Sequence, residues 1–209
     1  AKAFREAIAL RPDEPVAYLD LGNVLSYSGH VAEAAQRYLE AKELYAVDSR
    51  HWARATAGAF EKLKLVKECG EVAKPKWWND EGLKALSARV VRAAPNEVVA
   101  HHMRAEVLTG GLGLGSAWKA GPRSPAEFKE AATHYEQAAA LCPAPAQKTG
   151  LAGKAASCRT LAEFLPGAML TATDYKTHLL TGSIVVIDGL KSKPELNGRS
   201  AKVTGFITA

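Results

Sequence analysis

The chain has 209 residues, of which 47% are hydrophobic and 23% charged, and its formal net charge is +5. This composition is ordinary for a globular protein, and the length suits one domain of moderate size with or without a small appendage. The mild positive charge is weak evidence for nucleic-acid binding, and no apolar run approaches the roughly 18 residues of a membrane-spanning helix.

Residues 12–46 predict two amphipathic helices joined by a short turn at residues 28–30. Asp13 is the expected N-cap of the first helix, with Pro15 in its first turn, where a missing N–H costs little. Gly22 and Ala34 are expected to let the two helix backbones approach closely, with tyrosine rings filling the space beside them. The apolar and small residues recur at three- and four-residue spacing: Tyr18, Leu21, Gly22, Leu25, Ala34, Tyr38 and Ala41.

The spacing of these residues resembles the tetratricopeptide repeat (TPR), a helix–turn–helix unit of about 34 residues. The resemblance implies a mostly α fold, in which TPR-like helical hairpins with irregular insertions stack into a right-handed α–α superhelix. Phe4 and Ala7 lie 34 residues before Tyr38 and Ala41. We therefore expect residues 1–11 to be the second helix of a preceding repeat, in a chain that continues a longer protein.

A second repeat is expected from Trp52, which lies 34 residues after the first tyrosine of the pattern. Asp48 or Ser49 can cap its first helix, which is expected to run to about Cys69. Asn79 then caps the second helix, so this repeat carries an insertion in its turn.

A third repeat is expected because PNEVVAHHMRAEVL (95–108) matches PDEPVAYLDLGNVL (12–25) at six of fourteen positions. His101 takes the place of Tyr18. After a glycine-rich insert at 109–123, the residues from Ser124 to Glu127 form a capping box that opens the partner helix. A last helix at about 145–165, with Gly153 in the place of Gly22, is expected to cover the end of the stack. The helical repeat domain then spans residues 1–166.

The sequence changes character near the C-terminus, and residues 180–209 form a second expected domain. Residues 183–188 and 201–207 predict strands, with a turn signal at Asn197-Gly198. This segment resembles the opening hairpin of SH3-like and KOW-type small barrels. The resemblance implies a β hairpin, either packed on the helices or belonging to a truncated barrel that continues beyond residue 209.

The TPR resemblance implies a non-catalytic scaffold for protein–protein interaction, which holds a peptide or partner helix in a concave groove. The first helix of each repeat lines that groove. Carried over position by position, the partner-binding residues are Leu19, Asn23, Ser26, Arg54, Ala57, His102 and Glu106.

Two other functions stay open. The first is an RNA- or ribonucleoprotein-associated factor, in which bases stack on aromatic rings beside a basic track. Its candidate residues are Lys74, Lys76, Trp77, Trp78, Lys191, Lys193 and Arg199. The second is the docking region of a larger enzyme.

The residue types of catalysis and metal binding form no local signature. The glycine-rich loop at 110–115 lacks the third glycine of GxGxxG and follows a helix rather than a strand, so nucleotide binding is not expected. Three widely spaced cysteines, none in a CxxC pair, argue against zinc and favour a reducing, cytoplasmic location. We expect no enzyme activity, no cofactor, no metal and no membrane partner, and the oligomeric state stays open.

Overall fold

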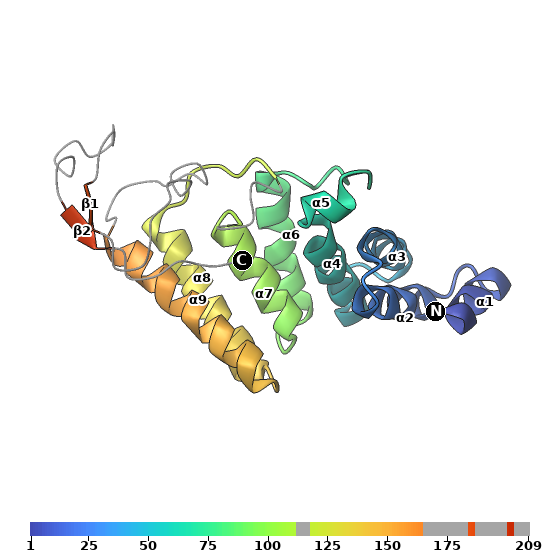
Figure 1. The fold of residues 1–209 in the computed structure, drawn as a ribbon. Helices are drawn as coiled ribbons and strands as arrows, with labels where there is room; N and C mark the ends of the chain where they lie inside the picture. The colour runs from blue at the N-terminus through green and yellow to red at the C-terminus, as the bar shows by residue number, and fades with distance from the viewer. Residues whose placement is uncertain (112–117, 165–183, 187–199, 203–209) are drawn as a thin grey trace. The chain divides into compact units, whose positions relative to one another are not determined.

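The structure is a computed structural model that describes residues 1–111, 118–164, 184–186 and 200–202. These residues form nine helices and two short strands (Figure 1). The chain divides into two compact units, Ala1–Arg104 and Ala105–Ala209. The predicted mostly helical fold is therefore confirmed, and each unit is described by itself.

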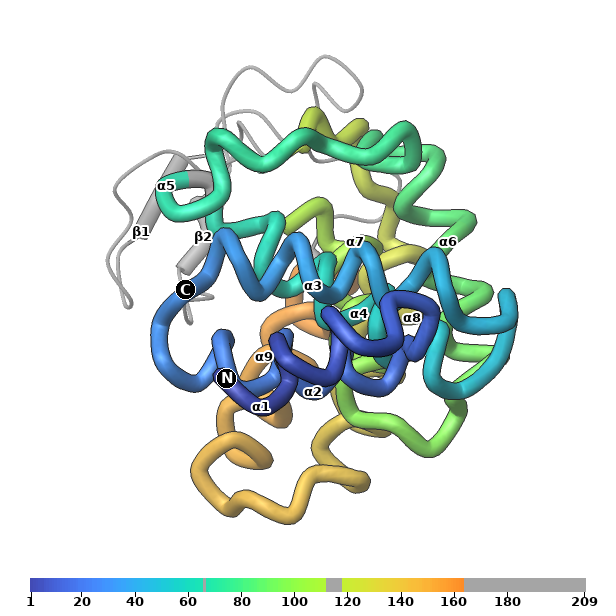
Figure 2. Tube along the Cα trace, turned by 90° about the vertical axis from the view of Figure 1, so that its right-hand side faces the viewer, coloured from blue at the N-terminus to red at the C-terminus, as the bar shows by residue number. Residues whose placement is uncertain are grey.

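In unit 1, α1 packs on α2, α2 on α3, α3 on α4 and α4 on α6, while the short α5 packs on α3 and α4. Figure 2 lets the path be followed from α1 through α3. The helices are α1 (Lys2–Leu10), α2 (Pro15–Tyr27), α3 (Val31–Leu44), α4 (Arg50–Leu63), α5 (Val66–Cys69), α6 (Asp80–Ala93) and the first part of α7 (Val98–Leu108).

The core of unit 1 is formed by the residues whose spacing predicted it. Tyr18, Leu21 and Leu25 of α2 are buried against small residues of α3 and α4. Alanines dominate the contact and allow the helix backbones to lie close together. The buried small and aromatic partners on the other two helices are Ala34, Tyr38, Ala41, Ala55 and Ala59.

The ring of Tyr38 lies between two glycines on neighbouring helices. A Cβ atom added to Gly22 of α2 would lie 2.8 Å from Tyr38 Cε1, and one added to Gly58 of α4 would lie 3.0 Å from Tyr38 Cδ1. Ordinary contacts between carbon atoms are about 3.5–4.0 Å. Both positions therefore need a residue without a side chain, and only Gly22 had been predicted.

Two segments that align in sequence also share hydrogen bonds. The Tyr18 hydroxyl donates to the Pro12 carbonyl (2.9 Å), and His101 Nε2 lies 2.8 Å from the Pro95 carbonyl. A carbonyl oxygen only accepts, so Nε2 of His101 carries a proton. The backbone bonds repeat as well, because the N–H groups of Glu14 and Glu97 each donate to the carbonyl three residues earlier.

We expect Tyr18→Phe to lower the free energy of unfolding of the chain by about 1 kcal/mol, because it leaves the Pro12 carbonyl without this donor. Urea denaturation followed by circular dichroism measures the change. Tyr27→Phe is the matched control, since the Tyr27 side chain is 93% exposed. We expect the loss of its hydroxyl to change the free energy of unfolding very little. Equal losses in the two variants would contradict a structural role for the Tyr18 hydroxyl.

Two predicted helix boundaries are wrong. Helix α2 has Glu14, not Asp13, as its N-cap, and no side chain caps it. Helix α4 ends at Leu63 instead of about Cys69. The last carbonyl of α4 is paired with a side chain from a later segment: Lys74 Nζ donates to the carbonyls of Leu63 (3.2 Å) and Cys69 (3.0 Å). That contact satisfies carbonyl groups that a longer helix would otherwise have paired.

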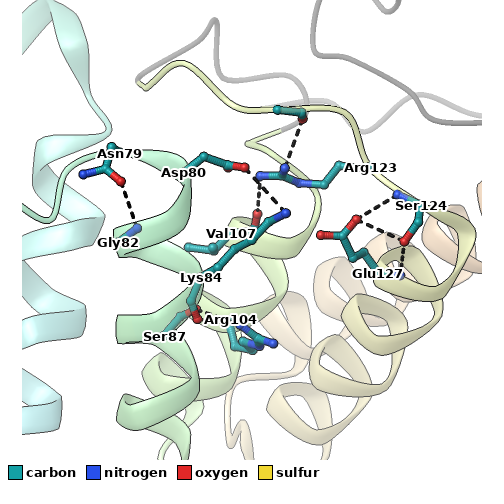
Figure 3. A network of polar contacts seen from close by, with 11 residues as sticks. Asn79, Asp80, Gly82, Lys84, Ser87, Arg104, Val107, Arg123, Ser124 and Glu127 are labelled. Atoms are coloured by element: carbon teal, nitrogen blue, oxygen red, sulfur yellow. Dashed lines mark hydrogen bonds and ion pairs between the residues drawn. The ribbon is translucent and has the colours of Figure 1, made fainter.

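Other predicted caps are confirmed. Ser49 Oγ accepts from the N–H of Trp52, and Asn79 Oδ1 accepts from the N–H of Gly82 at 2.9 Å (Figure 3). A Cβ atom on Gly82 would lie 2.6 Å from the Trp77 carbonyl oxygen, which explains a glycine in the first turn of α6. Within unit 1, Arg104 of α7 donates to the Lys84 carbonyl of α6 at 2.8 Å.

Unit 2 contains the end of α7, then α8 (Pro125–Leu141) and α9 (Pro145–Phe164), which pack on each other. The predicted capping box of Ser124 and Glu127 opens α8 (Figure 3). Buried Arg123 precedes it and donates to the carbonyls of Val107 and Gly121, both at 3.0 Å. Gly153 is not crowded as Gly22 is, because a Cβ atom on Gly153 would meet nothing within 4 Å.

Unit 2 also contains an antiparallel pair of strands, β1 (Ile184–Val186) and β2 (Ser200–Lys202). Val185 faces Ala201 in the register. The turn signal at 197–198 and most of the two predicted strands lie outside the described residues.

Candidate functional site

Helix α2 presents a stripe of side chains at positions 16, 20, 23 and 27, which fall on one side of a helix because of their spacing. Val16 is 49% exposed and Tyr27 is 93% exposed. Among the described residues, α2 carries three of the eight large hydrophobic side chains that are exposed, the third being Val24. Such a concentration of exposed apolar surface on one short helix is typical of an interaction site.

Asn23 and Ser26 lie beside the hydroxyl of Tyr38. Tyr38 Oη donates to Asn23 Oδ1 at 2.9 Å, and the Asn23 side chain is half-buried. Burial raises the pKa of Tyr38, an effect that Ser26 partly offsets, so the phenol keeps its proton at neutral pH. Asn23 therefore has a structural role, while its Nδ2 group retains donor capacity toward a ligand.

Arg54 of α4 is a half-buried cation, and no carboxylate of the described residues lies within ion-pair distance of it. Its charge acts on the Tyr38 and Tyr45 hydroxyls. Arg50, one turn earlier, differs because its guanidinium binds Glu97 at 2.6 Å. Arg54 is thus a cation of α4 that can pair with an incoming anion.

His102 of α7 contacts a residue that the sequence did not single out. His102 Nδ1 lies 3.0 Å from Glu61 Oε1, and Glu61 Oε2 also pairs with buried Lys64 at 2.8 Å. Glu61 stands seven residues after Arg54, on the same side of α4, and this spacing is the signal that could have identified it. The contact connects α4 with α7 inside unit 1.

Three predicted binding residues are buried. Leu19 is 5% exposed and packs in the core cluster of α2 and α3, and Ala57 has no exposed surface. Glu106, in unit 2, is also buried and pairs with Lys154 of α9 at 3.1 Å. We therefore leave these three side chains out of the surface that could meet a partner.

The tryptophan pair of the RNA hypothesis packs within unit 1. The rings of Trp77 and Trp78 are 5.7 Å apart, Trp78 lies 5.8 Å from Phe60, and both rings pack on the cluster around Leu63. Lys74 Nζ lies 5.5 Å from the Trp78 ring centre, and burial lowers the pKa of this amine. Lys76 is exposed, and Lys191, Lys193 and Arg199 lie outside the described residues.

These observations bring together Asn23, Ser26 and Arg54 with the stripe on α2, and they set His102 beside Glu61. Along the part of the chain that the structure describes, no helix is both long and apolar enough to cross a bilayer. In comparisons with protein-family models and with curated proteins, nothing matches this chain.

Proposed function

We propose that unit 1 is a non-catalytic protein-interaction module of TPR-like construction, which binds a peptide or a partner helix. Its binding surface, here called the α2–α4 face, consists of Val16, Asn23, Ser26, Tyr27 and Arg54. The observation that carries the proposal is the exposed apolar surface of α2, where Val16, Val24 and Tyr27 are 49%, 36% and 93% exposed.

The TPR-like construction is supported by repetition inside the chain. Aromatic or imidazole side chains at positions 18 and 101 bond to the carbonyl of a proline six residues earlier. Helices α2, α3 and α4 also pack in sequence through small residues. Repeat proteins built in this way use the surface of neighbouring helices to bind extended partners.

The residue types on the α2–α4 face suit a protein partner. Tyrosine and arginine are enriched among the residues that carry most of the binding energy of interfaces. Tyr27 offers a large ring for burial, while Arg54 offers a guanidinium to an acidic side chain. We therefore propose a partner segment with apolar residues and at least one Asp or Glu.

We also propose that β1 and β2 belong to a small barrel of the SH3-like type. The support is their antiparallel register together with the Asn197-Gly198 turn signal between them. A two-stranded ribbon alone is marginally stable in water, so such a pair needs further strands or a packing surface.

The proposed interaction is tested by affinity enrichment with isotope-labelled quantification, followed by titration of the recovered partner in purified form. We expect Val16→Ser/Tyr27→Ala to weaken the purified interaction by about tenfold or more, because it removes the exposed aromatic ring of the surface. Arg54→Glu is expected to weaken the interaction as well, and the Kd of this variant is expected to depend less on salt concentration than that of the native chain.

The matched control is Val47→Ser/Leu141→Ser, which removes exposed apolar side chains elsewhere, 63% and 38% exposed in the native chain. It is expected to leave the affinity unchanged. An interaction that survives Val16→Ser/Tyr27→Ala, or that both double variants weaken equally, would contradict the assignment of the α2–α4 face.

A further inference from the structure

Unit 1 has a shallow depression of about 340 Å³ between the segment that precedes α2 and the side of α3. Its lining is apolar where it meets Pro12, Tyr18 and Leu39, and acidic at Glu40 and Glu43. Such a surface, which contains an aromatic ring and two carboxylates, suits a side chain that is both flat and positively charged.

The second repeat of the same unit shows a guanidinium in the corresponding setting. Arg89 of α6 binds Asp48 through two hydrogen bonds, Nε–Oδ1 at 3.1 Å and Nη2–Oδ2 at 3.0 Å. The centre of its guanidinium lies 5.2 Å from the centre of the Trp52 ring. Trp52 is only 2% exposed.

The residues of the two places correspond one to one. Trp52 and Asp48 lie 34 residues after Tyr18 and Glu14, at the spacing of the repeat. The second helices are aligned by their ends, because the N–H groups of the C-caps Tyr45 and Ala94 donate to Ala41 and Val90 respectively.

Counting back from these C-caps places Glu40 of α3 where Arg89 stands in α6, five residues before the cap in both helices. The first repeat therefore has a carboxylate in the position that holds the cation of the second. Glu14 also retains the acidic character of Asp48. The depression beside Tyr18 thus combines an aromatic ring with the carboxylates of Glu40 and Glu43, and no guanidinium of the described residues lies over that ring.

The two carboxylates of the depression have capacity to accept more hydrogen bonds. Glu40 accepts from Arg37 (2.6 Å) and Gln36 (3.1 Å), which hold it in place, whereas a carboxylate offers about four acceptor sites. Glu43 pairs with its neighbour Lys42 and its side chain is 74% exposed. A guanidinium can approach both carboxylates and fork its donors between them.

We propose that this depression binds an arginine side chain of a partner protein, stacked on Tyr18 as Arg89 is stacked on Trp52. Leu44, which lines the depression and is 41% exposed, would cover the aliphatic part of that side chain. The site uses α3, which contributes no residue to the α2–α4 face, so either proposal can fail without the other.

The probe is acetyl-arginine N-methylamide, titrated into the whole ¹⁵N-labelled chain and followed by the amide signals of Tyr18, Leu39 and Glu40. Because the probe offers one stacked cation and only exposed ion pairs, we expect a saturable response with a Kd on the order of 10 mM. Added salt is expected to weaken this binding. Acetyl-citrulline N-methylamide has the same shape without the charge and is expected to give no saturable response. Equal responses to the two probes, or none to arginine, would overturn the proposal.

Glu40→Arg is the decisive variant, because it places in α3 the residue type that the second repeat uses. We expect it to abolish the response to the arginine probe, with Glu71→Arg, an equal charge change at an exposed position, leaving the response intact. If Glu40→Arg is not folded, Glu40→Gln/Glu43→Gln is expected to weaken binding roughly fivefold. Full binding by a folded Glu40→Arg variant, or by Glu40→Gln/Glu43→Gln, would contradict the site.

Discussion

Tyr38→Ala is expected to lower the free energy of unfolding of unit 1 by about 3–5 kcal/mol, which is the usual cost of removing a buried aromatic ring. The Tyr38 ring fills the space between Gly22 of α2 and Gly58 of α4, so its loss leaves a gap bordered by two helix backbones. Urea denaturation monitored by circular dichroism measures the change.

Tyr38→Phe is the matched control for this prediction. It keeps the ring and removes only the hydroxyl that donates to Asn23 at 2.9 Å. The expected loss is about 1 kcal/mol, the net worth of one hydrogen bond. Losses of similar size for the two variants would contradict the view that the ring itself holds α2, α3 and α4 together.

Gly22→Ala and Gly58→Ala are each expected to destabilise unit 1 by about 1–2 kcal/mol. Alanine favours a helix over glycine by about 1 kcal/mol, but a buried methyl group that contacts an aromatic ring at 2.8–3.0 Å costs more than this. Thermal unfolding of the two variants and of the native chain gives the sign directly.

Gly153→Ala in α9 is the control for the glycine substitutions, since a Cβ atom there would meet nothing within 4 Å. It is expected to stabilise its helix by roughly 0.5–1 kcal/mol. The same chemical change thus has opposite expected signs at a crowded and at an open position. Stabilisation by Gly22→Ala would show that the crowding around Tyr38 is not the reason for the glycine.

The sequence predicted much of the helical arrangement because spacing reports which side of a helix is buried. The buried aromatic and small residues of α2 and α3, the third segment around His101 and the capping box at Ser124 all follow from local patterns. Gly58 was missed because it stands two residues beyond the position that the repeat pattern assigns to glycine, Thr56. The end of α4 was missed because the partner of its last carbonyl, Lys74, lies eleven residues away.

The candidate site was harder to predict than the fold. A repeat pattern states which way a side chain points, but it does not state what covers that side chain. Leu19 and Ala57 stand at positions that the pattern assigns to the groove, but the structure buries both of them. The role of Glu61 was not predicted, because a single acidic residue on a helix has no distinctive sequence pattern. Its contact with His102 is visible only in the structure.

The central claim is that the ring of Tyr38 on α3 fills the space between Gly22 of α2 and Gly58 of α4, and that glycine at position 22 makes room for it. A double-mutant cycle with Gly22→Ala and Tyr38→Ala tests it most directly. We predict that Gly22→Ala destabilises the native chain and stabilises the Tyr38→Ala variant, where the ring no longer stands in the way. Free energies of unfolding that simply add, with Gly22→Ala equally harmful in both backgrounds, would contradict the claim.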